Sequence, residues 1–162
     1  MTKARVLIVD DEPAPSALVG MYLEETGLYD VVVENLSYQA VATARRFKPE
    51  VVLLDVNMPG KDGGDVAAEI RADGQLAGTP ILFFTSLVSP EEAEDRKPSR
   101  NGELFLSKKA EAAVVVRTIA SVLEQTAAAK PVRVFVTNST ASNSPEPTRT
   151  SADRAPHDRI GF

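Results

Sequence analysis

The sequence lacks cysteine and tryptophan and has one histidine, His157, which lies close to the C-terminus. Without a thiol the chain can form no disulfide, no cysteine-ligated zinc site and no cysteine nucleophile. Because residues 1–156 contain no histidine, a Ser-His-Asp triad and a histidine-rich metal site are excluded there. Any chemistry in this part must therefore come from Asp, Glu, Lys, Ser and Thr.

A long apolar run is also missing from the N-terminus. Residues 6–9 are apolar, but Asp10 interrupts the run, which is too short for a signal peptide or a membrane span. We therefore expect a cytoplasmic protein that does not associate with a membrane.

The charge of the chain is negative and unevenly distributed. The net charge is −5, from 18 basic and 23 acidic residues. Residues 129–162 hold five basic and three acidic residues, so their net charge is +2 and residues 1–128 carry −7. Attraction to phosphates supplies most non-specific affinity for nucleic acids, so we expect no nucleic-acid partner.

Composition divides the chain into one domain, residues 1–128, and a polar tail, residues 129–162. In Thr137–Ser151, twelve of fifteen residues are Ser, Thr, Pro or Asn, too polar to offset the entropy of folding. Only Val132–Val136 alternates enough to form a short strand. We predict a disordered tail without an effector domain, which would need its own core.

Within the domain, five short β-branched runs alternate with amphipathic segments. Most of the runs are apolar at consecutive positions, as expected for strands buried on both faces of a parallel sheet. The predicted strands are Arg5–Val9, Asp30–Glu34, Val51–Leu54, Ile81–Phe84 and Leu104–Leu106. The predicted helices are Ala14–Thr26, Tyr38–Phe47, Gly64–Ala72, a short Pro90–Arg96 and Glu111–Ala128, with 97–102 as a loop.

Three of these helices carry apolar residues at helical spacing, and the second, Tyr38–Phe47, has Ala40, Ala44 and Phe47 on one side. The first has Leu18, Met21 and Tyr22 with Glu25, and the last has a stripe of Val115, Ile119, Val122 and Leu123. The order βαβαβαβαβα with right-handed crossovers predicts an open, doubly wound α/β sheet with helices on both faces. Ligands of such sheets bind at the carboxyl ends of the strands.

The residues that follow the predicted strands can support phosphoryl chemistry. They are Asp10, Asp11, Asp55, Thr85 and Lys108. Singly, each suits a helix terminus, a turn or a solvated surface, but the fold gathers them at one edge, and clustered carboxylates need a cation. Oxygen ligands favour Mg²⁺, with Mn²⁺ as a possible substitute. An Asp on such a metal is a candidate nucleophile for phosphorus, and Lys108 and Thr85 could contact the phosphoryl oxygens.

Four segments resemble the receiver domain of two-component response regulators, and the resemblance covers about residues 4–127. They occur in the family's order, and they are Val6–Glu12, Leu53–Gly63, Thr85-Ser86 and Phe105–Lys108. The resemblance implies the flavodoxin-like (βα)5 fold, with a five-stranded parallel sheet in the order 2-1-3-4-5. It also implies a stand-alone receiver of the chemotaxis type, a phosphoacceptor signalling protein and not an enzyme.

The resemblance further implies specific roles for matched residues. Asp55 would accept a phosphoryl group from a histidine kinase or a histidine phosphotransfer protein. Asp10, Asp11, Asp55 and the backbone carbonyl of Asn57 would hold Mg²⁺. Lys108 would contact the phosphoryl group, and Thr85 and Phe105 would couple phosphorylation to a change of the surface.

The sequence departs from the family at two places. Lys109 stands where the family usually has a proline with a cis bond; a non-proline cis bond costs about 2.5–4 kcal/mol, so we expect a trans bond or a shifted loop. Lys109 could then compete with Lys108. The second departure lies between Thr85 and Phe105, where the predicted helix Pro90–Arg96 is short and polar, and it alters the usual output face.

Three other functions are alternatives to this interpretation. Haloacid-dehalogenase-type phosphatases have a second Asp two residues after the nucleophile, but Asn57 stands there and cannot act as an acid. A dinucleotide site would need a glycine-rich turn after the first strand, where this chain is acidic. A receiver-like interaction module that takes no phosphate remains the third alternative. For the output we expect either phosphorylation-dependent docking to an unknown target protein or a phosphorelay. We expect the protein to be a monomer or a weak homodimer.

Overall fold

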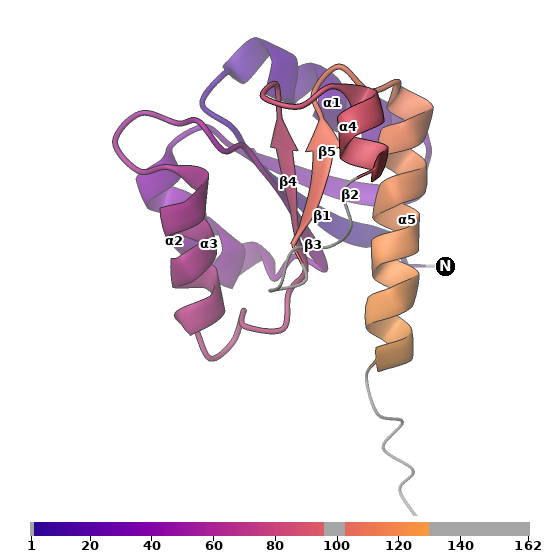
Figure 1. Cartoon of the computed structure of the whole chain (residues 1–162). Helices are drawn as coiled ribbons and strands as arrows, with labels where there is room; N and C mark the ends of the chain where they lie inside the picture. Colours follow the sequence, from indigo (N-terminus) through magenta and orange to yellow (C-terminus); the bar gives the residue numbers. More distant parts are fainter. Residues whose placement is uncertain (1, 96–102, 130–162) are drawn as a thin grey trace, which may run out of the picture. The chain divides into compact units, whose positions relative to one another are not determined.

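The computed structural model describes residues 2–95 and 103–129, which form an α/β domain with a parallel five-stranded sheet (Figure 1). The sheet has the order β2-β1-β3-β4-β5, as predicted. Its strands are β1 (Ala4–Val9), β2 (Tyr29–Glu34), β3 (Val51–Leu54), β4 (Ile81–Thr85) and β5 (Leu104–Ser107). The helices are α1 (Pro13–Glu25), α2 (Ala40–Phe47) after the 3-10 turn η1 (Ser37–Gln39), α3 (Gly63–Ala72), α4 (Pro90–Asp95) and α5 (Ala112–Ala129). Ala129, predicted as the first residue of the tail, is the last residue of α5. The rest of the tail with its candidate strand, and the loop 97–102, lie outside the described residues.

Strand residues alternate between two hydrophobic cores, one on each face of the sheet. Leu7 and Leu54 point toward α2 and α3, whereas Ile8 and Leu53 point toward α1 and α5. All four are at most 1% exposed. Figure 1 shows α2 and α3 together on one face of the sheet and α5 on the other. Burial on both faces explains why the strands are apolar at consecutive positions.

Local signals fix where several helices begin and end. Pro13 occupies the first turn of α1, where its missing N–H costs no hydrogen bond. The carboxylate of Asp62 caps α3 by accepting a hydrogen bond from the N–H of Asp65 at 2.9 Å. Lys48 ends α2 in the left-handed region with a φ of 54°, and Pro49 follows it. The signals at Pro13 and Asp62 fix where α1 and α3 begin, after the loops that follow β1 and β3.

The apolar residues at helical spacing on α1 do not face the sheet, contrary to the prediction. Leu18 and Met21 are 68% and 59% exposed, whereas the buried residues of the helix are Ser16, Gly20 and Leu23. Small residues face the sheet because α1 packs closely against it: a Cβ on Gly20 would lie 3.3 Å from Cγ2 of Val33. The larger apolar side chains are therefore left on the outer face.

The last helix agrees with its predicted stripe. Val115, Ile119 and Val122 are buried against the sheet, and Leu123 is partly buried beside them. Among the described helices, α5 alone is long and apolar enough to cross a membrane. Its packing identifies it as a core helix of the domain and argues against a membrane span.

Candidate functional site

The sheet itself positions the backbone of the site. Asp10, Asp55 and Lys108 each come directly after a strand, and each backbone N–H makes a ladder hydrogen bond to a neighbouring strand. Asp10 donates to the carbonyl of Glu34 at 3.1 Å, and Asp55 donates to that of Val9 at 2.9 Å. Lys108 donates to the carbonyl of Thr85 at 2.9 Å. The three side chains consequently emerge at the same edge of the sheet.

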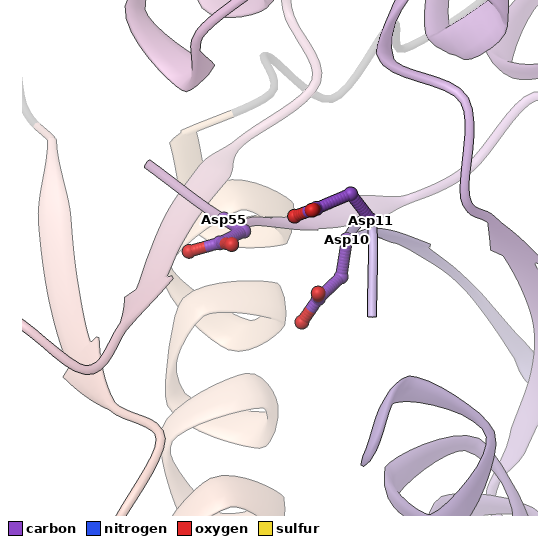
Figure 2. Close-up of side chains that lie close together, drawn as sticks. All are labelled: Asp10, Asp11 and Asp55. Atoms are coloured by element: carbon purple, nitrogen blue, oxygen red, sulfur yellow. The ribbon is translucent and has the colours of Figure 1, made fainter. Parts of the chain in front are cut away.

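Three carboxylates meet at this edge, as Figure 2 shows. One oxygen from each of Asp10, Asp11 and Asp55 lies within 4.8 Å of the others. Asp10 and Asp55 are only 2% and 5% exposed, and Asp11 is half-buried. Like charges at this spacing repel one another strongly because burial removes the water that would screen them. The arrangement therefore requires a positive counter-charge.

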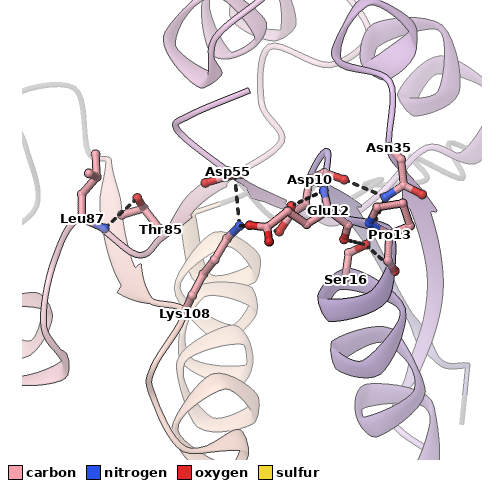
Figure 3. Close-up of polar contacts among 9 residues, drawn as sticks. All are labelled: Asp10, Glu12, Pro13, Ser16, Asn35, Asp55, Thr85, Leu87 and Lys108. Atoms are coloured by element: carbon pink, nitrogen blue, oxygen red, sulfur yellow. Dashed lines mark hydrogen bonds and ion pairs between the residues drawn. The ribbon is translucent and has the colours of Figure 1, made fainter. Parts of the chain in front are cut away.

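Lys108 supplies part of that counter-charge (Figure 3). Its Nζ lies 2.7 Å from Asp10 Oδ2, 3.1 Å from Asp55 Oδ2 and 3.5 Å from Glu12 Oε1. Burial pulls the pKa of Lys108 down, but its hydrogen bonds to Asp10 and Asp55 outweigh burial and raise the pKa above its usual value. The ammonium is thus held in its charged form between the two carboxylates.

For Asp55, the effect of burial on the pKa outweighs that of the neighbouring positive charge. Burial raises the pKa of its carboxyl above the usual value, although Lys108 and the backbone N–H of Asn57 lower it. Asp10 adds to the rise through repulsion. The Asp55 carboxylate is therefore poorly hydrated and depends on nearby cations, which is the setting for a reactive oxygen nucleophile.

The structure also distinguishes between the two neighbouring lysines. Lys109 is exposed, and its backbone N–H donates to Ser107 Oγ at 3.2 Å. Its side chain lines a separate groove between α4 and α5. Replacement of the family's proline has therefore not displaced Lys108, which is the lysine that faces the acids.

Asn57, whose backbone carbonyl was predicted to bind the metal, is exposed in the loop after β3. Two further predicted residues lie on β4 and β5. Thr85 is 2% exposed, and its Oγ1 accepts a hydrogen bond from the N–H of Leu87 at 3.2 Å. The ring of Phe105 stacks on Phe83, with centroids 5.2 Å apart and an interplanar angle of 21°. Thr85 is the last residue of β4, the strand next to β3, which Asp55 follows (Figure 3), and Phe105 belongs to an aromatic pair.

Sequence reasoning missed three residues around the acidic loop. Glu12 pairs with Lys108, and the side chains of Ser16 and Asn35 hydrogen-bond to the backbone of the loop. Glu12 had a signal, since it extends the acidic run. No sequence pattern indicated Ser16 or Asn35, because only the close packing of α1 on β2 brings these two residues together.

The donor set at this edge fits a divalent metal ion. All the side-chain ligands are carboxylate oxygens, which hard divalent cations prefer. One lysine leaves the three clustered carboxylates with a net negative charge, which a dication would offset. The cluster thus has the composition of a divalent metal site.

Comparison with known proteins agrees with the fold and the site. The model of the response regulator receiver domain family matches residues 6–120. Protein PilH of Pseudomonas aeruginosa is 32% identical over 121 residues, which cover 74% of this chain and 98% of PilH. The structure of the chemotaxis protein CheY4 of Vibrio cholerae superposes with a TM-score of 0.63 at 30% identity, covering 75% of this chain and 99% of that one.

Other relatives are longer than the matched region. The DNA-binding dual master transcriptional regulator RpaA of Synechocystis is 40% identical over 85 residues, but the match covers 51% of this chain and 34% of RpaA. The chain therefore spans about a third of that relative. Receiver domains are phosphoacceptor signalling modules, not classical enzymes, and histidine kinases phosphorylate them. From the family match and the geometry of the site, the chain belongs to the response regulator receiver domain family of two-component signalling.

Proposed function

We propose that this protein is a single-domain response regulator that accepts a phosphoryl group on Asp55 in a Mg²⁺-dependent reaction. The observation that carries the proposal is the position of the Asp55 carboxylate, buried among acids and 3.1 Å from the Lys108 ammonium. A histidine kinase or a histidine phosphotransfer protein would be the donor.

The transfer needs no base at the acceptor. A carboxylate oxygen of Asp55 attacks phosphorus, the phosphorus–nitrogen bond of the donor phosphohistidine breaks, and the imidazole leaves with the electron pair. Lys108 favours the ionised form of Asp55 and then neutralises charge on a phosphoryl oxygen. The hydroxyl of Thr85 already accepts one hydrogen bond and retains a proton to donate to another phosphoryl oxygen.

Asp10, Asp11 and Asp55, with the backbone carbonyl of Asn57, would hold the Mg²⁺, and Mn²⁺ would bind to the same oxygen ligands. The bound ion would neutralise charge that develops on the phosphoryl oxygens during transfer. Asp10 and Asp11 bind the ion, whereas Asp55 must both bind it and attack. Removing Asp10 or Asp11 should therefore weaken metal binding without removing the nucleophile.

The donor must be a separate molecule or lie outside the described residues, because residues 1–156 contain no histidine. We infer that the donor docks at the groove between α1 and α5. Leu18 and Tyr22 are exposed there and line, together with Lys108, an apolar hollow of about 270 Å³ beside the site. Leu18→Glu should slow transfer from a phosphorylated donor protein and leave phosphorylation by acetyl phosphate unchanged.

For the output, we infer that phosphorylation draws Thr85 toward the phosphoryl group and lets Phe105 turn, which reshapes the surface near α4 and α5. The change is a shift between two populated states. A target protein would read the new surface, or Asp55 would pass its phosphate along a relay. We expect a cytoplasmic monomer or weak homodimer that binds no nucleic acid.

Intact-protein mass spectrometry tests the proposal. The protein is incubated with acetyl phosphate and Mg²⁺, and parallel samples contain EDTA or the Asp55→Asn variant. The wild type should gain one phosphoryl group, and both parallel samples should gain none. Equal labelling of Asp55→Asn would contradict the assignment of the acceptor, and an unlabelled wild type would favour an interaction module that takes no phosphate.

A comparison of unmodified and phosphorylated protein tests the output. In a pull-down, capture of only a kinase or phosphotransfer protein would support a relay. A further partner that binds only the phosphorylated protein would support an effector role. DNA binding in either state would contradict the charge argument.

A further inference from the structure

Asn35, the residue directly after β2, hydrogen-bonds to the backbone of the acidic loop. Its Nδ2 lies 2.6 Å from the carbonyl oxygen of Asp10 and 3.0 Å from Ser16 Oγ (Figure 3). A carbonyl oxygen can only accept, so the group that faces it must be the amide NH₂ of Asn35. We propose that Asn35 is a positioning residue that fixes the direction of Asp11 and thereby sets the affinity of the site for a divalent metal ion. This inference rests on the proposed metal site.

The hydrogen bond to Asp10 acts through a peptide plane. The carbonyl oxygen of Asp10 belongs to the planar peptide that joins Asp10 to Asp11. Holding this oxygen restrains ψ of Asp10 and φ of Asp11, and so the direction in which the Asp11 side chain leaves the backbone. The N–H of Glu12 donates to Asp10 Oδ1 at 2.9 Å and restrains the next peptide. Asp11 is thus held from both sides.

Ser16 connects this restraint to the first turn of α1. It is 1% exposed, and its hydroxyl donates to the carbonyl of Glu12 at 2.7 Å while it accepts from Asn35. The carbonyl of Pro13 lies 3.2 Å from the same oxygen. Asn35 and Ser16 therefore tie the end of β2, the acidic loop and the start of α1 into one hydrogen-bonded unit.

The restraint opposes the repulsion within the acidic cluster. Asp11 lies close to Asp10 and Asp55, and the ammonium of Lys108 pairs with those two and with Glu12. An unrestrained Asp11 would move toward solvent, and metal binding would have to restore its position. The hydrogen bond from Asn35 orders Asp11 when the protein folds, so the metal ion binds to ligands that are already in place. Residues that orient metal ligands commonly change affinity by about 10–100-fold.

The test measures Mn²⁺ affinity by the electron paramagnetic resonance signal of the free ion, in wild type, Asn35→Ala and Ser16→Ala. Asn35→Ala should raise the dissociation constant about tenfold, and Ser16→Ala should raise it less. The dissociation constant of the double variant should be about the same as that of Asn35→Ala, because both changes break the same hydrogen-bonded unit. Amide NMR shifts should change most at Asp11 and Glu12.

Thr43→Val provides a matched control. The Thr43 hydroxyl donates to Glu34 Oε2 at 2.6 Å and accepts from Arg46 Nη2 at 3.1 Å. This change therefore also removes two side-chain hydrogen bonds, one of them at the end of β2, away from the acidic loop. Its Mn²⁺ affinity should equal that of the wild type, and circular dichroism should show that every variant is folded. Unchanged affinity in Asn35→Ala, or an equal loss in Thr43→Val, would overturn the role of Asn35. A wild type that binds no Mn²⁺ would overturn the metal site as well.

Discussion

At the scale of single residues, the site balances three clustered carboxylates against one ammonium group. Burial raises the pKa of Asp55, so the folded protein binds a proton there more readily than the unfolded chain does. Above that pKa the ionised carboxylate destabilises the metal-free fold relative to the unfolded chain. The charge at position 55 is therefore retained at a cost in stability.

Asp55→Asn should accordingly raise the free energy of unfolding of the metal-free protein at neutral pH. Thermal denaturation in EDTA measures the effect as a higher midpoint temperature. Asp30→Asn is the control, because Asp30 lies exposed on β2 and its removal should leave the midpoint nearly unchanged. A lower midpoint for Asp55→Asn would show that its attraction to Lys108 exceeds the cost of burial.

The pKa of Asp73 is shifted in the opposite direction, below its usual value. Hydrogen bonds from the N–H of Gln75 and from Arg45 lower the pKa of this carboxyl. A lowered carboxyl pKa contributes stability that is present above the unfolded-state pKa and is lost as the pH falls through the folded-state pKa. Asp73 therefore stabilises the turn that follows α3 at neutral pH.

We predict that Asp73→Asn lowers the free energy of unfolding at neutral pH and that the difference from wild type shrinks in acid. Urea denaturation at a series of pH values below neutral measures both curves. Parallel curves over the whole range would contradict the stabilising role of the Asp73 charge.

The sequence predicted the positions of Asp10, Asp55 and Lys108, because parallel strands end at a common edge and each of these residues directly follows a strand. It did not predict the contacts of Asn35 and Ser16. Those contacts depend on how closely α1 packs against β2, which no local pattern in the chain reveals.

At the scale of elements, the N-terminus of α3 lies against the end of β3. A Cβ on Gly63 would overlap the carbonyl oxygen of Asp55 and lie 2.9 Å from Cα of Val56. The backbone at Asp55 and the start of α3 can therefore be this close only if residue 63 is glycine.

Gly63→Ala should lower the free energy of unfolding by about 3 kcal/mol, because the backbone at Asp55 must shift. Gly64→Ala is a close control: its Cβ would meet only a side-chain oxygen of Asp62, at 3.2 Å, so its effect should stay below about 1 kcal/mol. Urea denaturation of both variants makes the comparison, and equal effects would contradict the close approach at Gly63.

The aromatic pair between β4 and β5 gives a second prediction at this scale. Phe83→Leu removes the stacking partner of Phe105 and should cost about 1 kcal/mol beyond the loss of buried area. Phe105 should then change rotamer more readily, which ¹³C-labelled ring NMR detects. Unchanged ring dynamics would show that other contacts hold Phe105.

The apolar face of α1 shows why helix patterns alone misassigned one surface. Large apolar residues favour burial, so Leu18 and Met21 were expected to face the sheet, yet Gly20 and Ser16 do so because the helix packs at close range. The stripe on α5 was predicted correctly, since larger side chains mediate its contact with the sheet.

At the scale of the whole molecule, the fold places acids from β1 and β3 and a lysine after β5 at one edge of a buried sheet. The strand order follows from the alternation of strands and helices together with the resemblance to receivers. The output face does not follow from the sequence, because the chain departs from the family between Thr85 and Phe105.

The central claim is that Asp55 is the phosphoacceptor, and the most direct measurement is reductive trapping of the acyl phosphate. After treatment with acetyl phosphate and Mg²⁺, borohydride reduces an aspartyl phosphate to homoserine, which tandem mass spectrometry locates in the digested chain. The account predicts homoserine at position 55 and its absence when EDTA replaces Mg²⁺. Homoserine at Asp10, Asp11 or any other position in place of Asp55, or none at all, would contradict it.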